Sequence, residues 1–280
     1  MIDPKLKNRV ALITGANHGI GAASAKALAR QGAKVFISYL RLGEDYVRDR
    51  EKAYEQAQSS TADEVLQEIR ESGGIAEAYE ADLSDSTTIP ELFNQAEKIF
   101  GPVEILINNA AFCNPDTFDP NTTTQEAKTG LVTNTLTAEK YEKHFVVNTR
   151  ATALMMEEFA KRHKERKANW GRIINTSTDW AECFPTEISY GASKAAMESF
   201  SRSAAVELGK YGITVNIVAP GPIQTGWMSQ EVAEHQASQN PLKRIGTPED
   251  LADVIVFLAS KQARWLTGQR LFVGGGNRII

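Results

Sequence analysis

Tyr190 and Lys194 lie four residues apart in the helical pattern SYGASKAAM (189–197). Residues at this spacing share one face of a helix, so the phenol and the ammonium can lie side by side. A neighbouring ammonium favours the phenolate and lowers the pKa of a tyrosine toward the range of a useful general acid or base. The same spacing also occurs on ordinary amphipathic helices, so the interpretation depends on the residues around it.

Two polar residues from earlier in the chain could complete a site. Ser177 lies at the hydroxyl-rich end of the strand-like run IINTST (173–178), 13 residues before Tyr190. Its hydroxyl could hold a substrate carbonyl together with the phenol. Asn148 is an amide in the otherwise apolar helical stretch FVVNTRATALM (145–155), where such a side chain usually has a specific hydrogen-bonding role. These residues indicate proton transfer at a carbonyl or alcohol oxygen.

A glycine-rich stretch, TGANHGIG (14–21), follows the apolar run RVALI (9–13). Gly15 would allow a sharp turn after a strand, Gly19 would let a pyrophosphate approach the backbone, and Gly21 would let a helix pack closely on the sheet. The start of that helix offers unpaired N–H groups and a positive dipole end, which favour a phosphate. A plain glycine-rich turn is the alternative, because the spacing is not the G-x-G-x-x-G fingerprint.

The end of the expected second strand, KVFISYL (34–40), bears on which dinucleotide would bind. The strand ends without an acidic residue and runs into Arg41, with Tyr39 just before it. A guanidinium can bind a 2′-phosphate with two hydrogen bonds, whereas the acidic residue typical of NAD sites would repel it. NADP(H) is therefore favoured over NAD(H). Glu44 and Asp45 follow closely and leave NAD(H) open.

Two further strand ends carry polar residues. Asp82 follows the run AEAYE (76–80) and could accept a hydrogen bond from an adenine amino group, or it could simply begin the next helix. NNAA (108–111) ends another apolar run and could line the cofactor. In parallel sheets, such residues meet at the carboxyl edge of the strands.

The chemistry-bearing residues fall on a regular alternation of short strand-like runs and helical patterns. The strand-like runs are RVALITG, KVFISYL, AEAYEADL, VEILINNAA, GRIINTST, ITVNIVAPG and RLFVGGG. This alternation predicts an α/β fold: a doubly wound, Rossmann-type parallel sheet of about seven strands between two helical layers. We expect a single catalytic domain over residues 1–280, with excursions at 41–60 and 112–136.

Composition excludes several function classes. The net charge of -4 gives no strong attraction to nucleic acid. Cys113 and Cys183 have neither disulfide-framework nor metal-ligand spacing, so we expect no metal site and a reducing compartment. No apolar run is long enough to span a bilayer, and the N-terminus lacks the pattern of a signal peptide. We therefore expect a cytoplasmic protein with no membrane contact.

Together, these motifs resemble the short-chain dehydrogenase/reductase family. The likeness covers nearly the whole chain, from TGANHGIG through ADLSD, NNAA, Asn148, Ser177, YGASK and PGPIQTG (220–226) to LTGQRLFVGGG, in the family's order. It implies an NAD(P)-dependent oxidoreductase acting on a small-molecule carbonyl or alcohol, similar in layout to bacterial 3-oxoacyl-thioester reductases. Sugar or polyol dehydrogenases and a catalytically silent dinucleotide-binding regulator are the alternatives. The family also implies a homotetramer.

The resemblance implies a role for each site residue. Tyr190 would exchange the proton, Ser177 would hydrogen-bond the substrate oxygen, Lys194 would bind the nicotinamide ribose and lower the Tyr190 pKa, and Asn148 would hold a relay water. The implied cofactor-binding set is Gly15, Asn17, His18, Gly19, Ile20, Gly21, Tyr39, Arg41, Asp82, Leu83, Asn109, Ala110, Ala111, Tyr190, Lys194, Pro220, Gly221, Ile223 and Thr225.

Three positions depart from the family's pattern. Ala111 replaces the glycine of the usual NNAG, and Gly274 replaces the acidic residue of the usual VDGG. His18 stands where NADP-preferring relatives often carry arginine, which weakens the preference for NADP(H).

Between Ser177 and Tyr190, the side chains of Trp180, Cys183 and Phe184 predict a partly apolar substrate pocket, to which Trp227 and Met228 would add.

Overall fold

The computed structural model describes residues 3–42, 52–121, 125–126 and 132–278. Its centre is a seven-stranded parallel sheet in the order β10-β9-β8-β4-β1-β2-β3. The strands are β1 (Val10–Thr14), β2 (Lys34–Tyr39), β3 (Ile75–Glu80), β4 (Ile105–Asn108), β8 (Gly171–Thr176), β9 (Ile213–Pro220) and β10 (Arg270–Val273). Six of the seven predicted strand-like runs contain one strand each, and β3 begins one residue before its predicted run, at Ile75, so the predicted fold class is confirmed.

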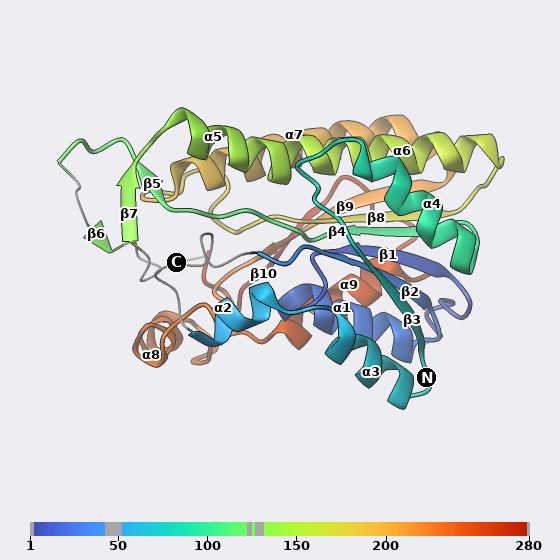
Figure 1. Cartoon of the computed structure of the whole chain (residues 1–280), viewed down its shortest axis with the longest axis horizontal. Coiled ribbons are helices and arrows are strands. Elements are labelled where there is room, and N and C mark those ends of the chain that lie inside the picture. Colours follow the sequence, from blue (N-terminus) through green and yellow to red (C-terminus); the bar gives the residue numbers. More distant parts are fainter. Residues whose placement is uncertain (1–2, 43–51, 122–124, 127–131, 279–280) are drawn as a thin grey trace.

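Helices cover both faces of the sheet and make the expected three layers (Figure 1). One layer contains α1 (Gly19–Arg30), α3 (Asp63–Glu71) and α9 (Pro248–Ala259). The other contains α4 (Thr88–Phe100), α5 (Ala138–His144), α6 (Thr152–Glu165) and α7 (Ile188–Leu208). Side chains that alternate along β1 fill both interfaces: Ile13 packs in the core cluster with α1 and α9, and Leu12 in the cluster with α4 and α6.

The strand order reverses next to β1. β1 pairs with β2 on one side and with β4 on the other, so the connections leave in opposite directions from this point. A crevice forms at such a switch point, beyond the carboxyl ends of the strands. The fold therefore brings the ends of β1, β4 and β8 together as the place for a ligand.

The two excursions contain more regular structure than their polar sequences predict. Residues 41–60 include helix α2 (Lys52–Ser59), while Glu44 and Asp45 lie outside the described residues. Residues 112–136 contribute β5 (Asp116–Thr117), β6 (Gln125–Glu126) and β7 (Val132–Thr135), which form a small sheet in the order β5-β7-β6. This small sheet and α8 (Gln230–Gln239) lie toward the same end of the molecule, on the left in Figure 1.

Two short irregular helices complete the described elements. A π-helical segment, Phe145–Ala151, joins α5 to α6, and a 3₁₀ turn, Gly209–Tyr211, follows α7. Among the helices that the structure describes, none has the length and apolar character needed to cross a membrane.

Candidate active site

The glycine turn between β1 and α1 packs tightly against the end of β4. Gly15 has a φ of +62°, and a Cβ on it would lie 2.8 Å from Ala110 Cα. A Cβ on Gly21 would lie 2.3 Å from Gly15 O. Side chains are excluded at both positions by contact with backbone. The turn leaves the N-terminus of α1, where Gly19 and Ile20 begin the helix, at the carboxyl edge of the sheet.

The NNAA segment is tied to this turn by Thr14, a residue that the sequence motifs did not single out. Thr14 Oγ1 accepts hydrogen bonds from Asn109 N at 3.0 Å and from Ala110 N at 3.1 Å. Asn109 Nδ2 donates to Gly15 O at 2.8 Å and to Thr14 O at 3.1 Å. Ala111 is exposed. Asn109 and Ala110 thus line the glycine turn.

Helix α2 and the loop after β9 fold over the glycine turn. Asn17 Nδ2 donates to Ser60 O at 3.0 Å and to Ala57 O at 3.2 Å. The His18 ring lies edge-on to Tyr54, with 5.6 Å between ring centroids, and burial lowers the pKa of His18. Thr225 approaches from the other side, its Cγ2 3.2 Å from the position of a Cβ on Gly19. The contacts from α2 were not predicted, because its sequence looks like a solvated surface.

Arg41 is paired with a neighbouring carboxylate. Its Nε lies 3.0 Å from both Glu80 oxygens, and its Nη2 lies 2.8 Å from Glu80 Oε2. Tyr39 and Glu80 are register partners in β2 and β3, which places the acid beside Arg41. Hydrogen bonds from Arg41 hold the pKa of Glu80 below its usual range. Arg41 therefore stands at the predicted place for a 2′-phosphate, but it shares its charge with Glu80.

Asp82 behaves as a turn residue in this structure. Its Oδ1 accepts a hydrogen bond from Ser84 N at 2.8 Å, and its carbonyl oxygen accepts one from Thr88 Oγ1 at 2.8 Å. This is the helix-start alternative, although the exposed carboxylate remains able to accept a further hydrogen bond. Leu83 beside it is 8% exposed and packs in the core with α4.

The PGPIQTG segment lies between the end of β10 and the loop around Gly246. A Cβ on Gly221 would lie 2.8 Å from Gly274 Cα, so two glycines meet where strands β9 and β10 end. This close contact gives a physical reason for Gly274 in place of the family's acidic residue. Ile223 forms a bridge with Gly246, and Trp227 Nε1 donates to Ile223 O at 3.1 Å. Pro220 is the last residue of β9.

Tyr190 and Lys194 project from the first turns of α7 into the protein. Lys194 Nζ donates to Thr176 O, at the end of β8, at 2.8 Å, and it lies 5.7 Å from the centre of the Tyr190 ring. Burial lowers the pKa of Lys194 to about 8. Burial also raises the pKa of Tyr190 well above its ordinary value. The lowering of the Tyr190 pKa that we expected from Lys194 is therefore outweighed by burial, and the phenol holds its proton.

Asn148 lies in the π-helical segment, a kind of helix often found at functional sites. Its side chain is fully buried, with Oδ1 accepting from Phe112 N at 2.7 Å and Nδ2 donating to Phe112 O at 2.8 Å. Nδ2 also donates to Ser193 Oγ at 3.0 Å. Asn148 therefore joins the loop after β4 to α7. Both of its N–H groups are used by the protein, which leaves Oδ1 as the side-chain atom able to hold a relay water.

Ser177 directly follows β8, is buried, and donates a hydrogen bond to Glu198 of α7. Its Oγ lies 2.5 Å from Glu198 Oε1. Among the described residues no hydrogen bond joins Ser177 to Tyr190. The structure thus brings Tyr190, Lys194 and Asn148 around the ends of β4 and β8, and it directs the Ser177 hydroxyl elsewhere.

Aromatic rings surround Tyr190. The Phe184 ring centroid lies 6.1 Å from that of Tyr190, and Trp180 lies 6.0 Å from Phe184. His144 lies 6.4 Å from Tyr190 on the other side and contacts Phe112 at 4.8 Å. Trp180 and Phe184 supply part of the predicted apolar surroundings, whereas Cys183 is exposed. The contributions of Phe112 and His144 were not predicted.

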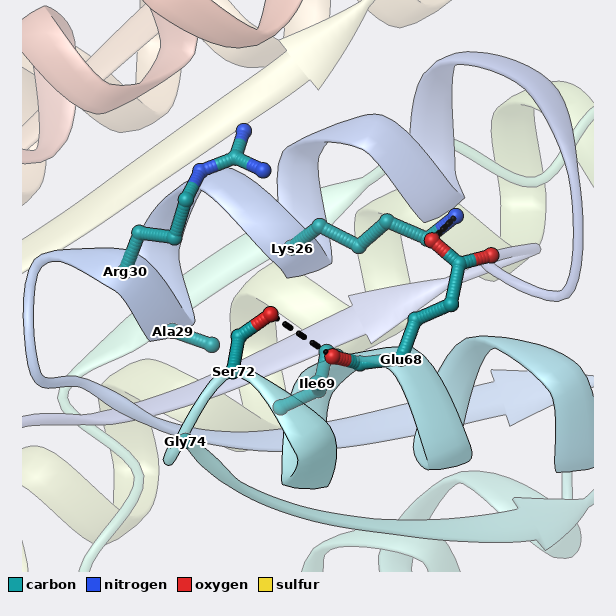
Figure 2. A pocket seen from close by; sticks show the side chains of 7 residues that line it. All are labelled: Lys26, Ala29, Arg30, Glu68, Ile69, Ser72 and Gly74. Carbon is teal, nitrogen blue, oxygen red and sulfur yellow. Dashed lines mark hydrogen bonds and ion pairs between the residues drawn. The ribbon is translucent and has the colours of Figure 1, made fainter.

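A separate crevice between α1 and α3 does not belong to this site. It has a volume of about 30 Å³ and is lined by Lys26, Ala29, Arg30, Glu68, Ile69, Ser72 and Gly74. Figure 2 shows the Lys26–Glu68 ion pair across it and the hydrogen bond from Ser72 to the Glu68 backbone. Its α1 residues, Lys26, Ala29 and Arg30, lie in the half of the helix away from the glycine turn, and the other lining residues belong to α3 and the residues that follow it. Among the described residues, no group of His, Cys, Asp and Glu side chains could hold a metal ion.

The arrangement fits a dinucleotide. A glycine turn without side chains meets a helix N-terminus, which suits a pyrophosphate. The turn leads past Asn109 toward a buried lysine and a protonated phenol, which suit a ribose and a reacting oxygen. Chemically, the site can deliver a proton to an oxygen atom next to a bound nicotinamide.

Known proteins are similar to this chain in sequence and fold over almost its whole length. Residues 15–278 match the family described as enoyl-(acyl carrier protein) reductase. NADPH-dependent aldehyde reductase 2 of Arabidopsis thaliana is 35% identical over 277 residues, which cover 97% of this chain and 94% of its own length. Versicolorin reductase stcU of Emericella nidulans is 34% identical over 289 residues, which cover 97% of this chain and 96% of its own.

A solved structure shares the architecture. A variant of a Serratia marcescens short-chain dehydrogenase/reductase has a TM-score of 0.79 and 28% identity, covering 98% of this chain and 99% of that chain. The parallel sheet, the glycine turn at its switch point and this full-length similarity agree with one another. The chain belongs to the short-chain dehydrogenase/reductase family and is an NAD(P)-dependent oxidoreductase.

Proposed function

We propose that this protein is an NADP(H)-dependent carbonyl reductase for substrates with an apolar or aromatic group next to the carbonyl. The observation that carries the proposal is the geometry of α7: Lys194 is buried and fixed on Thr176 O at the end of β8, and the half-buried Tyr190 lies beside it, with 5.7 Å from Lys194 Nζ to the ring centre. The raised pKa of Tyr190 keeps the phenol protonated. A protonated acid at this position suits the reductive direction, in which the substrate oxygen must gain a proton.

The bound nicotinamide would supply the hydride, and residues of this chain would bind the cofactor, orient the substrate and supply the proton. Tyr190 would give its proton to the substrate oxygen. Lys194 would bind the nicotinamide ribose and favour the phenolate left behind. Asn148 would keep the loop after β4 in register with α7 through its bonds to Phe112 and Ser193. A hydroxyl that follows the end of β8 would hold the substrate oxygen.

The rings around Tyr190 support the choice of substrate class. Trp180, Phe184 and Phe112 present flat apolar surfaces near the phenol, which favour an aromatic or alkyl group over a polyol. A sugar or polyol dehydrogenase would need polar partners for several hydroxyls there. A 3-oxoacyl thioester, whose acyl chain is apolar, remains compatible as a second substrate class.

The choice of NADP(H) rests on Arg41 and on a relative. Arg41 follows β2 at the position where a 2′-phosphate would lie, and one of the similar proteins is named as NADPH-dependent. The Glu80 carboxylate competes for the same guanidinium. We infer that Glu80 limits the preference for NADP(H) without abolishing it, since a phosphate carries more charge than a carboxylate.

Replacing Arg41 and Glu80 in turn should move cofactor affinity in opposite directions. In Arg41→Ala, NADPH should bind about tenfold more weakly while NADH binding changes little, because one charge-assisted contact to the phosphate is lost. In Glu80→Gln, NADPH should bind more tightly, because the guanidinium is released. Fluorescence titration of each variant with both cofactors measures this. Tighter NADH than NADPH binding in the unaltered protein would contradict the cofactor assignment.

We also propose a homotetramer in a reducing, cytoplasmic setting. Large apolar side chains are exposed on two surfaces: Phe200 (51%) and Val206 (84%) on α7, and Phe272 (51%) on the edge strand β10. A tetramer with D₂ symmetry would result if each surface paired with its own copy across a two-fold axis. Sedimentation should give the mass of four 30.7 kDa chains, and Val206→Glu should reduce it. A monomer at micromolar concentration would contradict this. The proposal of a reducing compartment rests on the sequence, in which Cys113 and Cys183 lie far apart and without the spacing of a disulfide framework.

The activity itself is tested by following the consumption of NADPH with two probe carbonyls, benzaldehyde and ethyl acetoacetate. Turnover of either probe supports a reductase, and their relative kcat/KM separates an aryl-aldehyde preference from a 3-oxoacyl preference. Tight NADPH binding with no turnover of these or other carbonyls would instead favour a silent dinucleotide-binding protein.

A further inference from the structure

The proton of the Ser177 hydroxyl is used inside the protein. Ser177 Oγ lies 2.5 Å from Glu198 Oε1, and the Glu198 side chain is only 4% exposed. The same carboxylate faces Arg270 Nε at 3.0 Å and Arg202 Nη1 at 3.4 Å. A carboxylate paired with two guanidinium groups accepts hydrogen bonds and has no proton to give. Ser177 is therefore the donor, and its one proton cannot also serve a substrate oxygen.

Thr178 is the adjacent hydroxyl, and its proton has no such acceptor. Thr178 is 7% exposed, and its Oγ1 accepts only a long hydrogen bond from Trp180 N, at 3.4 Å. In the part of the chain that the structure describes, no group accepts the Thr178 hydroxyl proton. That proton is therefore available to a ligand oxygen in the cleft.

The backbone of Thr178 is held firmly in place. Ser177 N and Asp179 N donate to Val218 O at 2.7 Å and to Pro220 O at 3.0 Å, so the chain continues beside β9 in an extended form. Successive side chains of an extended chain point to opposite sides, which directs Thr178 away from the side on which Ser177 meets Glu198. Arg270 Nη2 donates to Thr178 O at 2.8 Å, so one arginine fixes both this backbone and Glu198.

The loop that starts at Thr178 returns directly to the catalytic helix. A Cβ on Gly191, the residue after Tyr190, would lie 2.8 Å from Phe184 Cβ and 3.6 Å from Trp180 O. Lys194 holds Thr176 O, two residues before Thr178. The threonine thus lies between two contacts that join β8 and its loop to the Tyr190 end of α7.

We propose that Thr178, and not Ser177, donates the hydrogen bond to the substrate oxygen, and that Ser177, Glu198 and Arg270 form a buried cluster that positions it. This inference rests on the proposed reductase function. Tyr190 transfers the proton to the oxygen as the carbonyl carbon gains hydride, while Thr178 keeps its proton and only stabilises the developing negative charge. Thr178 is a catalytic residue in this assignment, whereas Ser177 acts through its neighbours.

The test compares matched variants of the two hydroxyls in the full-length protein, with NADPH and benzaldehyde as probes. Thr178→Val should lower kcat by about 10²–10³-fold, because it removes one donor to the oxyanion. Thr178→Ser should stay within about fivefold of the unaltered protein, because the donor is restored. Ser177→Ala should change kcat by less than about tenfold and should lower Tm, because it removes a donor to the buried carboxylate.

NADPH titration separates these effects from loss of folding, since each folded variant should bind NADPH within about twofold of the unaltered protein. Thr178→Ala serves as a second variant where Thr178→Val fails to bind. A hundredfold loss of kcat in Ser177→Ala with intact NADPH binding overturns the assignment, and so does near-normal kcat in both Thr178 variants. Absence of turnover in the unaltered protein would count against the reductase proposal itself, before any variant is compared.

Discussion

Tyr190→Phe is expected to lower kcat by about 10³-fold while leaving NADPH affinity nearly unchanged. Burial raises the pKa of Tyr190, so in the reductive direction the phenol is the proton source. Phenylalanine keeps the ring and its contacts with Phe184 and His144 and removes only the acidic group. Steady-state kinetics with benzaldehyde, together with NADPH titration, measure both quantities.

The structure also predicts that this variant folds normally. Among the described residues no hydrogen bond reaches Tyr190 Oη, so its removal leaves no buried partner unsatisfied. Tyr141→Phe is the matched control, because Tyr141 is 47% exposed and stacks on Phe145 away from the phenol. A parallel loss of NADPH binding and kcat in Tyr190→Phe would show that the residue is structural.

Lys194→Met should abolish most activity and at the same time stabilise the protein. Burial lowers the pKa of Lys194 from 10.5 to about 8, so at pH 7 the folded protein carries a buried ammonium that is disfavoured there. Removing the charge should raise the free energy of unfolding by about 1–2 kcal/mol, after allowance for the lost hydrogen bond to Thr176 O. Loss of the ribose contact and of the charge beside Tyr190 should lower kcat/KM at least about 10²-fold.

The pH dependence of stability gives an independent check on Lys194. Between about pH 8 and 10.5, Lys194 is protonated in the unfolded chain and deprotonated in the folded chain. The contribution of Lys194 to the free energy of unfolding therefore rises with pH across that window. The rise should disappear in Lys194→Met and persist in Lys164→Met, which removes an exposed lysine of α6. Urea unfolding at several pH values measures it. A less stable Lys194→Met protein would show that the ammonium contributes more through its contacts than it costs by burial.

The seven strands could be predicted because their signal is local. Runs such as RVALI are buried on both faces of the sheet, so they are apolar throughout, and each ends where the chain turns. Helix α2 and the sheet β5-β7-β6 could not be predicted in the same way. They are polar, and they are held by contacts such as that of Asn17 with the carbonyls of α2 and its end, which are distant in sequence.

The residues of the candidate site could be predicted from the sequence, but the side chains that they pair with could not. The positions of Tyr190, Lys194 and Asn148 follow from motif and spacing. The pairing of Arg41 with Glu80 appears only when β2 and β3 are placed in register. Likewise, spacing alone favours Ser177 over Thr178, whereas the buried Glu198 that takes up the serine proton is identified only by tertiary structure. The direction of the Tyr190 pKa shift also depends on burial, which a motif does not report.

The most direct test of the central claim is the transfer of deuterium from NADPH that carries deuterium at both C4 positions of the nicotinamide to the carbonyl carbon of benzaldehyde, followed by mass spectrometry of the alcohol formed. The account predicts one deuterium in the benzyl alcohol produced by the unaltered protein, with a yield reduced about 10³-fold by Tyr190→Phe. Unlabelled alcohol, or tight binding of NADPH without any alcohol from benzaldehyde or ethyl acetoacetate, would contradict it.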